Sequence, residues 1–175
     1  HPIRQVFWEP FWVFGFDLDQ RVAWFHGREV APAWSLAHPF IKLLHPWLRT
    51  RAIHIVHAGA VGDESGCALI IGPGGSGKST LTIASRLAGL TYLGDDYVAV
   101  RLARPQVAAR AFGLYRIAKL VPAHMRALLP EVEAHRLADD GAKSRLVLDV
   151  THPDGLPIVA IVIPTVIPGT TRAEP

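Results

Sequence analysis

The central part of the chain alternates between short apolar runs and one segment with helical periodicity. Short apolar runs bounded by glycine or polar turns are typical of buried strands. The helical segment begins near Lys78 and stops at Gly89, the residue type that most often follows a helix C-terminus. We therefore expect strands over residues 53–57, 67–71, 91–93 and 97–100, a turn over 62–66 and a helix over 78–88.

The region before residue 51 has a different pattern. Aromatic and aliphatic residues dominate two runs separated by polar residues, which is typical of a hairpin whose aromatic side chains lie in a core. A later segment has apolar residues at helical spacing. We expect a β-hairpin with strands within 6–16 and 22–25, followed by an amphipathic helix over 36–51 that holds Pro39 in its first turn and is kinked by Pro46.

The C-terminal part predicts a helix over 122–129, a polar turn at 138–141 and strands over 145–150 and 158–163. The last run consists mainly of Ile and Val, which is typical of a strand buried on both faces. Together with the central pattern, these elements predict an α/β fold.

Length and composition indicate one folded domain. The chain has 175 residues, of which 50% are hydrophobic and 19% are charged, as in ordinary globular domains. We expect a single domain over 1–175, in which the hairpin and helix of residues 1–50 precede a nucleotide-binding core over 51–165. Because there is no initiating Met, we also expect this to be a fragment.

Charge, the length of apolar stretches and cysteine content limit the expected partners and the expected location of the chain. The formal charge is only +3, and no basic run marks a nucleic-acid or membrane surface. No apolar stretch is long enough to span a bilayer, and the first residues do not resemble a signal peptide. The single Cys67 cannot form an internal disulfide and is expected to be buried, which fits a cytoplasmic protein.

The most informative motif lies between the expected strand 67–71 and the expected helix 78–88. It matches the phosphate-binding pattern of Gly, four residues, Gly, Lys and Ser or Thr, in the strand–loop–helix context that the pattern requires. Glycines leave backbone amides free to face phosphate oxygens, and a helix N-terminus adds partial positive charge. We expect ATP to bind at Gly72, Gly74, Gly75, Ser76, Gly77, Lys78, Ser79 and Thr80, with Lys78 on the β- and γ-phosphates and the Ser79 hydroxyl on Mg²⁺.

Two adjacent carboxylates, Asp95 and Asp96, follow the next expected strand. This is where proteins with such a loop place a metal-binding or proton-accepting group. Lys78 and Mg²⁺ would help keep one carboxylate ionised, so that it can accept a hydroxyl proton. His57, at the end of strand 53–57, is a candidate hydrogen-bond donor or proton shuttle near the phosphates; a structural role for it is the alternative.

The combination of His57 to Val61, residues 72–79 and Gly94 to Tyr97 resembles the kinase domain of the bacterial HPr serine kinase/phosphorylase family and its shorter relatives. The resemblance covers about residues 50–165. It implies a phosphate-binding loop set in a mixed sheet flanked by helices, as in the C-terminal domain of HPr kinase and in phosphoenolpyruvate carboxykinases. It also implies a homo-oligomer.

The same resemblance implies roles for individual residues. Lys78 would bind phosphate, Ser79 would ligate magnesium and Asp95 would accept the proton of the attacking serine hydroxyl. Asp96 would support the metal or Asp95, and His57 would lie beside the γ-phosphate. The chain departs from the family at Ala108, where full HPr kinases carry a magnesium-binding glutamate. This makes HPr itself a less favoured substrate and puts the reverse phosphorylase activity in doubt.

The sequence therefore predicts an ATP- and Mg²⁺-dependent kinase that phosphorylates a hydroxyl, favouring serine of a protein or peptide. Two alternatives remain open at this point. One is a nucleotide-binding regulatory module or NTPase without an acceptor, and the other is a small-molecule kinase. The residues do not identify the acceptor.

Overall fold

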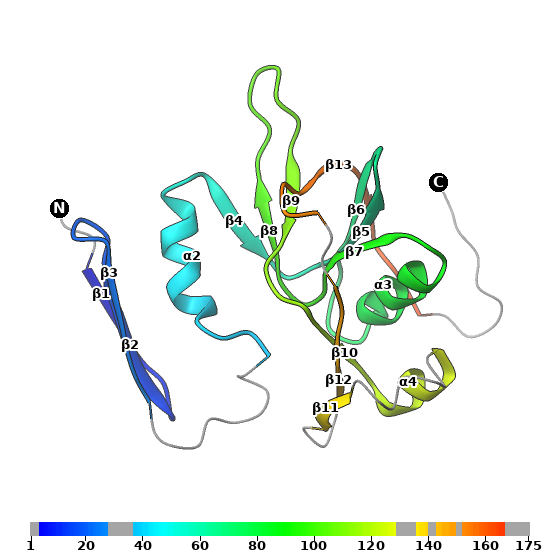
Figure 1. Ribbon diagram of the computed structural model, residues 1–175, viewed down its shortest axis with the longest axis horizontal. Helices are drawn as coiled ribbons and strands as arrows, with labels where there is room; N and C mark the ends of the chain where they lie inside the picture. The colour runs from blue at the N-terminus through cyan, green and yellow to red at the C-terminus, as the bar shows by residue number, and fades with distance from the viewer. Residues whose placement is uncertain (1–3, 28–36, 129–135, 140–142, 150–151, 167–175) are drawn as a thin grey trace.

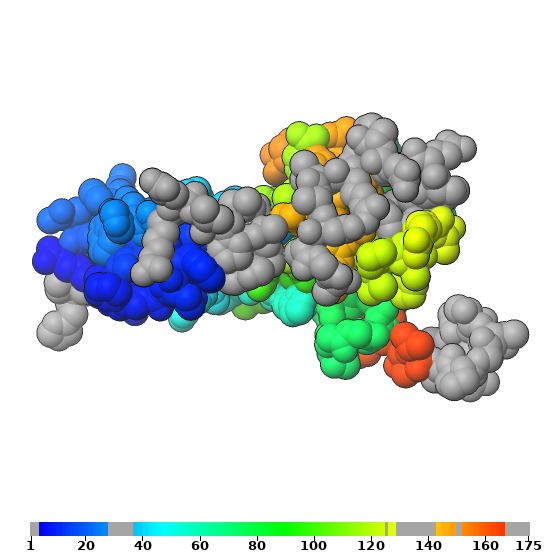
Figure 2. Space-filling model, turned by 90° about the horizontal axis from the view of Figure 1, so that it is seen from below, coloured from blue at the N-terminus to red at the C-terminus, as the bar shows by residue number. Residues whose placement is uncertain are grey.

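The computed structural model describes residues 4–27, 37–128, 136–139, 143–149 and 152–166. It is a mixed α/β structure with a three-stranded N-terminal sheet, a seven-stranded mixed sheet and a second three-stranded sheet. Figure 1 shows the N-terminal sheet at one end of the molecule, with helix α2 (Ile41–Arg49) between it and the large sheet, and the space-filling view in Figure 2 has the same sheet, in blue, at that end. The expected α/β class is confirmed as a large mixed sheet flanked by few helices.

The seven-stranded sheet forms the centre of the molecule, in the order β4-β8-β9-β13-β6-β5-β7. β13 runs parallel to β6, and every other neighbouring pair in the described part of this sheet is antiparallel. The strands are β4 (Ile53–Val56), β5 (Gly59–Asp63), β6 (Gly66–Ile70), β7 (Thr91–Gly94), β8 (Val98–Arg101), β9 (Arg110–Gly113) and β13 (Leu156–Val162).

The elements expected around the glycine-rich loop are confirmed. Helix α3 (Lys78–Leu87) begins at Lys78, and Gly89 follows its last residues with a φ of 100°, the left-handed conformation that favours glycine at this position. The expected strands 53–57, 67–71, 91–93 and 97–100 correspond to β4, β6, β7 and β8. Strand β5 was not predicted as a strand, because its glycines and alanine carry little apolar signal.

Helix α3 packs closely against β5. A Cβ placed on Gly59 would lie 2.1 Å from the Thr82 Oγ1 atom of this helix. Thr82 is fully buried, and its hydroxyl donates a hydrogen bond to the Lys78 carbonyl at 2.9 Å. This close approach requires glycine at position 59, and it fixes the first turn of α3, with Lys78, relative to the sheet.

Two apolar clusters hold these layers together. The first fills the large sheet, and its buried members include the expected core residue Cys67. The second joins α3 and β7 to a neighbouring sheet formed by β10 (Ile117–Leu120), β12 (Ser144–Val147) and β11 (Arg136–Asp139). Its buried members are Ile83, Tyr92, Ala118, Leu120 and Leu146. Lys119 is thereby held between two buried neighbours on β10.

Predictions for the C-terminal half are confirmed in part. Helix α4 (Pro122–Leu128) matches the expected helix as far as residue 128. Residues 138–139 of the expected turn belong to β11, and residues 140–141 lie outside the described residues. The expected strand 145–150 is the shorter β12.

The expected burial of run 158–163 on both faces is wrong. Val159 is 67% exposed and Ile161 is 62% exposed. β13 pairs with β6 along residues 158–162, whereas its register with β9 covers only residues 156–157. The β-branched residues favour a strand, but the described chain places no second layer over this part of it.

The expected N-terminal hairpin is wrong in its number of strands. The structure has a three-stranded antiparallel meander of β1 (Arg4–Trp8), β2 (Trp12–Asp17) and β3 (Val22–Gly27). The aromatic run breaks at Pro10, which cannot donate a hydrogen bond to a strand neighbour. Phe14 and Phe16 are buried, but Trp8 is 79% exposed, so the expected core position holds for only some of the aromatic residues.

The expected helix 36–51 is too long. Residue 36 lies outside the described residues. Helix α2 begins at Ile41 because Phe40 has a φ of 59°, a left-handed conformation that a right-handed helix cannot include. Pro46 lies inside α2 as expected. Neither α2 nor any other described helix is long and apolar enough to cross a membrane.

Candidate functional site

The glycine-rich loop, residues 72–79, connects β6 to α3. Gly72, Gly75 and Gly77 have φ angles of 146°, 81° and 94°, which side-chain-bearing residues rarely adopt. The chain therefore needs glycine at these positions to follow this path. The loop leads into the N-terminus of α3, where backbone N–H groups have no partner within the helix and can bind an anion.

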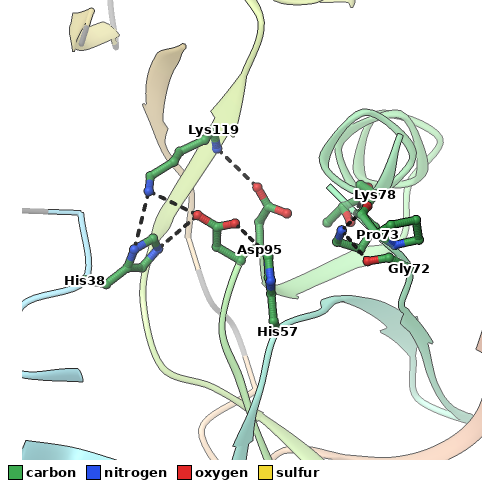
Figure 3. Close-up of polar contacts among 9 residues, drawn as sticks. His38, His57, Gly72, Pro73, Lys78, Asp95 and Lys119 are labelled. Carbon is green, nitrogen blue, oxygen red and sulfur yellow. Dashed lines mark hydrogen bonds and ion pairs between the residues drawn. The ribbon is translucent and has the colours of Figure 1, made fainter. Parts of the chain in front are cut away.

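Open space and hydrogen-bond donors occur together at this loop. A Cβ added to Gly74 or Gly75 would meet no atom within 4 Å. The Ser76 hydroxyl is buried and has no hydrogen-bond partner. The buried Lys78 ammonium donates to the carbonyls of Gly72 at 2.7 Å and Pro73 at 2.9 Å (Figure 3). An unsatisfied hydroxyl, open space above glycine and a lysine held at the loop suit an anionic group.

Asp95 lies immediately after β7 and is 1% exposed. Its Oδ2 atom accepts a hydrogen bond from the Lys119 backbone N–H at 3.1 Å. Burial raises the pKa of this carboxyl, and the Lys119 N–H and the Ser79 side chain oppose the rise only in part. In Figure 3 Asp95 lies between Lys119 on one side and the loop with Lys78 on the other. Asp95 is therefore a buried, basic carboxylate beside the first turn of α3.

Asp96 has an opposite environment. Its φ of 67° turns the chain, and its two oxygens contact cationic or hydrogen-donating groups. Oδ1 lies 3.2 Å from His57 Nε2, and Oδ2 lies 3.1 Å from Lys119 Nζ and 3.7 Å from His38 Nε2. Burial would raise the pKa of Asp96, but the nearby Lys119 ammonium, with a smaller effect from His57, outweighs burial, so the pKa is lowered. Asp96 is ionised at neutral pH.

Two residues of this cluster were not predicted from the sequence. Lys119 contacts both aspartates, and His38 packs its ring edge-on against Tyr97 and Tyr115, with centroids 4.8 and 5.1 Å away. Burial, together with the Lys119 charge, lowers the pKa of His38 to about 4, so this histidine is neutral. No motif marks either residue, because His38 and Lys119 are 81 positions apart in the sequence.

Two other predicted positions lie around this centre. The Thr80 hydroxyl is 3.0 Å from His124 Nδ1, which ties α3 to α4. Position 108, which the sequence resemblance aligns with a glutamate of full HPr kinases, lies just before β9. The neighbouring Arg110 donates to the carbonyls of Asp154 and Gly155, and these contacts tie the β9 edge to the chain before β13.

The structure brings the predicted residues together in two groups. Ser79 lies beside Asp95, and His57 lies beside Asp96. In the described part of the chain, Asp96 forms no hydrogen bond or ion pair with Ser79, and His57 forms none with Lys78. No group of three or more His, Cys, Asp or Glu side chains in the described ranges is arranged to hold a metal ion. Mg²⁺ bound with substrate phosphates and water requires only one or two carboxylates.

No family model matches the chain, and no curated protein matches it. The resemblance to HPr-kinase-like proteins therefore remains a prediction from the sequence, and the function has to be inferred from the site.

Proposed function

We propose that this chain is an HPr-kinase-like, ATP- and Mg²⁺-dependent kinase that transfers the γ-phosphate to a hydroxyl group, serine of a protein or peptide being the favoured acceptor. The observation that carries the proposal is the position of Asp95. This buried carboxylate of raised pKa lies beside Ser79, at the start of the helix that follows the glycine-rich loop. A basic carboxylate next to a phosphate-binding loop is what hydroxyl phosphorylation requires.

The loop would bind the nucleotide through its backbone amides and Lys78. The space above Gly74 and Gly75 allows phosphate oxygens to approach the backbone, and the unpartnered Ser76 hydroxyl could donate to one of them. Lys78 would exchange its bonds to the Gly72 and Pro73 carbonyls for charge-assisted bonds to phosphate. Thr80, in the same turn of α3, would complete the site.

The residues present also fit a magnesium ion. Ser79 would hold it through its hydroxyl, and the Asp95–Asp96 pair would supply carboxylate oxygen directly or through water. A bound Mg²⁺ would supply positive charge that offsets the negative charge of the phosphates. Because the Ser79 side chain interacts with Asp95, a magnesium ion held by Ser79 would lie beside this carboxylate.

In the proposed step the acceptor hydroxyl oxygen attacks the γ-phosphorus while the bond from that phosphorus to the β–γ bridging oxygen breaks. Asp95 takes the hydroxyl proton, and ADP leaves with the bridging oxygen. Burial makes Asp95 the stronger base of the pair, whereas Asp96 stays ionised in its contacts with Lys119 and His57. Lys78 stabilises charge on the transferred group.

The experiment that tests the nucleotide site is the thermal shift of the chain with ATP and Mg²⁺. A ligand that binds only the folded state raises the unfolding midpoint, by an amount equivalent to about 2.7 kcal/mol at a hundred times its dissociation constant. We expect a shift for the wild-type chain and for Lys42→Ala, a lysine that pairs with Glu9 outside the site. We expect none for Lys78→Ala.

Each other outcome has a defined meaning. Equal shifts in wild type and Lys78→Ala would place the nucleotide elsewhere and contradict the proposal. A Lys78-dependent shift with no phosphate delivered to serine, threonine or small alcohols would favour a regulatory nucleotide-binding module instead. Delivery to a small alcohol alone would favour a small-molecule kinase.

A further inference from the structure

His38 comes from outside the expected nucleotide-binding core, yet it is buried inside the site. His38 is 8% exposed, and the neighbouring Ala37 is fully buried. The Tyr115 hydroxyl donates to the Pro39 carbonyl at 2.7 Å, which fastens this segment to the chain before β10. The imidazole ring itself lies against Tyr97 and Tyr115. The segment before α2 thus contributes a side chain to the aspartate cluster.

The polar contacts of His38 fix the hydrogen on its ring. Nδ1 lies 3.5 Å from Lys119 Nζ, and an ammonium group only donates, so Nδ1 must present a lone pair. The hydrogen then resides on Nε2. That atom faces Asp96 Oδ2 at 3.7 Å and is buried without a hydrogen-bond partner. His38 therefore stands between an ammonium and a carboxylate, with an acceptor toward one and a donor toward the other.

Lys119 transmits the effect of His38 to both aspartates. Its backbone N–H donates to Asp95 Oδ2, and its Nζ lies 3.1 Å from Asp96 Oδ2. Figure 3 shows the Lys119 side chain reaching toward His38 while its backbone faces Asp95. An acceptor at Nδ1 selects one position for the long Lys119 side chain, which would otherwise sample several rotamers.

We propose that His38 is a positioning residue for phosphoryl transfer, acting through Lys119 to hold the Asp95–Asp96 pair. The inference rests on the proposed function. It extends the catalytic site from the core of residues 51–165 to the segment before α2. If the ring only filled space between Tyr97 and Tyr115, a phenyl ring would serve equally well.

His38→Phe tests this distinction, because it keeps an aromatic ring and removes both nitrogens. His38→Asn restores an acceptor close to the Nδ1 position without the ring. The matched control is His45→Phe, the same substitution at an exposed histidine of α2. The measured quantity is the rate of label transfer from γ-labelled ATP to a serine-containing peptide library, together with the ATP concentration at half-maximal rate.

We expect His38→Phe to lower the rate about tenfold or more, as small misplacements of reacting groups do, with half-saturation by ATP changed less than twofold. His38→Asn should recover part of the rate, and His45→Phe should match the wild type. A wild-type rate in His38→Phe, or an Asn variant no faster than the Phe variant, would overturn the inference.

A second measurement does not depend on activity. Nitrogen-15 NMR of histidine-labelled chain, with the His38 signal assigned by its loss in His38→Phe, reports which ring nitrogen carries the hydrogen. We expect the Nε2–H tautomer, and the Nδ1–H tautomer would overturn the inference even if transfer is observed. A wild-type chain that binds MgATP but labels no acceptor would instead contradict the proposed function.

Discussion

Asp95 and Asp96 are adjacent in the sequence and lie in opposite electrostatic environments. Asp95 is buried with a raised pKa, whereas Lys119, with a smaller effect from His57, lowers the pKa of Asp96. The positive φ of Asp96 separates the two carboxylates, one toward Ser79 and the other toward the His38–Lys119 cluster. One carboxylate is thereby kept basic while its neighbour is kept ionised, a division of tasks that catalytic pairs commonly use.

Asp95→Asn should stabilise the fold at neutral pH. Because the folded pKa of Asp95 is raised, its favourable contribution is present below the unfolded value of about 3.8 and is lost as pH rises through the folded pKa. Removing the buried charge should raise the unfolding midpoint by about 2–4 °C at pH 7, the shift that ~1 kcal/mol gives in a domain of this size. Thermal unfolding at pH 7 and pH 3 measures this, and the gain should vanish at pH 3.

Asp96→Asn, in contrast, should destabilise the fold at neutral pH. The folded pKa of Asp96 is lowered, so its contribution is present above about 3.8 and is lost as pH falls through the folded pKa. Removing this carboxylate leaves the partly buried Lys119 ammonium without its counter-charge. The unfolding midpoint at pH 7 should fall by several degrees. If Asp95→Asn and Asp96→Asn moved the unfolding midpoint in the same direction, the opposite pKa shifts assigned to the two carboxyls would be incorrect.

Gly74→Ala should weaken the binding of MgATP and leave the stability of the fold almost unchanged. Gly74 has no positive φ, and a Cβ there would meet no atom within 4 Å, so the folded chain accommodates the methyl group and its midpoint should change by less than about 2 °C. If phosphate occupies this space, calorimetric titration should show MgATP affinity at least about tenfold weaker, a loss of ~1.4 kcal/mol. Unchanged affinity would mean that no phosphate lies over Gly74.

Gly59→Ala should destabilise the chain by displacing α3. The added Cβ would lie 2.1 Å from Thr82 Oγ1, and such overpacking typically costs about 1–3 kcal/mol. In a Thr82→Ala background the clash is removed, so the same substitution should cost much less. A double-mutant cycle in urea measures the coupling; additive costs would show that the Gly59–Thr82 contact does not hold α3.

The sequence predicted best where structure is set by neighbours along the chain. The elements on either side of the glycine-rich loop were predictable because apolar runs, Lys78 at the helix start and Gly89 at its end are local signals. The N-terminal meander was not, since the effect of Pro10 on an aromatic run depends on strand pairing. The exposure of Val159 and Ile161 depends on which layers cover β13, and composition does not report this.

The candidate site was predictable to a similar extent. Ser79, Asp95 and Asp96 follow from a motif and from strand order. His38 and Lys119 do not, because their contact is made by the docking of a segment against β10 across 81 positions. The different environments of the two aspartates also depend on that contact. The sequence could therefore identify the aspartate pair, but it could not indicate which carboxylate has the raised pKa and which the lowered one.

The most direct measurement of the central claim is phosphate transfer from γ-labelled ATP, with Mg²⁺, to a peptide library that contains serine, beside a matched library in which alanine replaces serine. We predict label on the serine library with the wild-type chain, none on the alanine library, and none with Asp95→Asn even though this variant still gives a thermal shift with MgATP. A normal rate of transfer in Asp95→Asn, or a wild-type chain that binds MgATP and labels neither serine nor any other hydroxyl, would contradict the account.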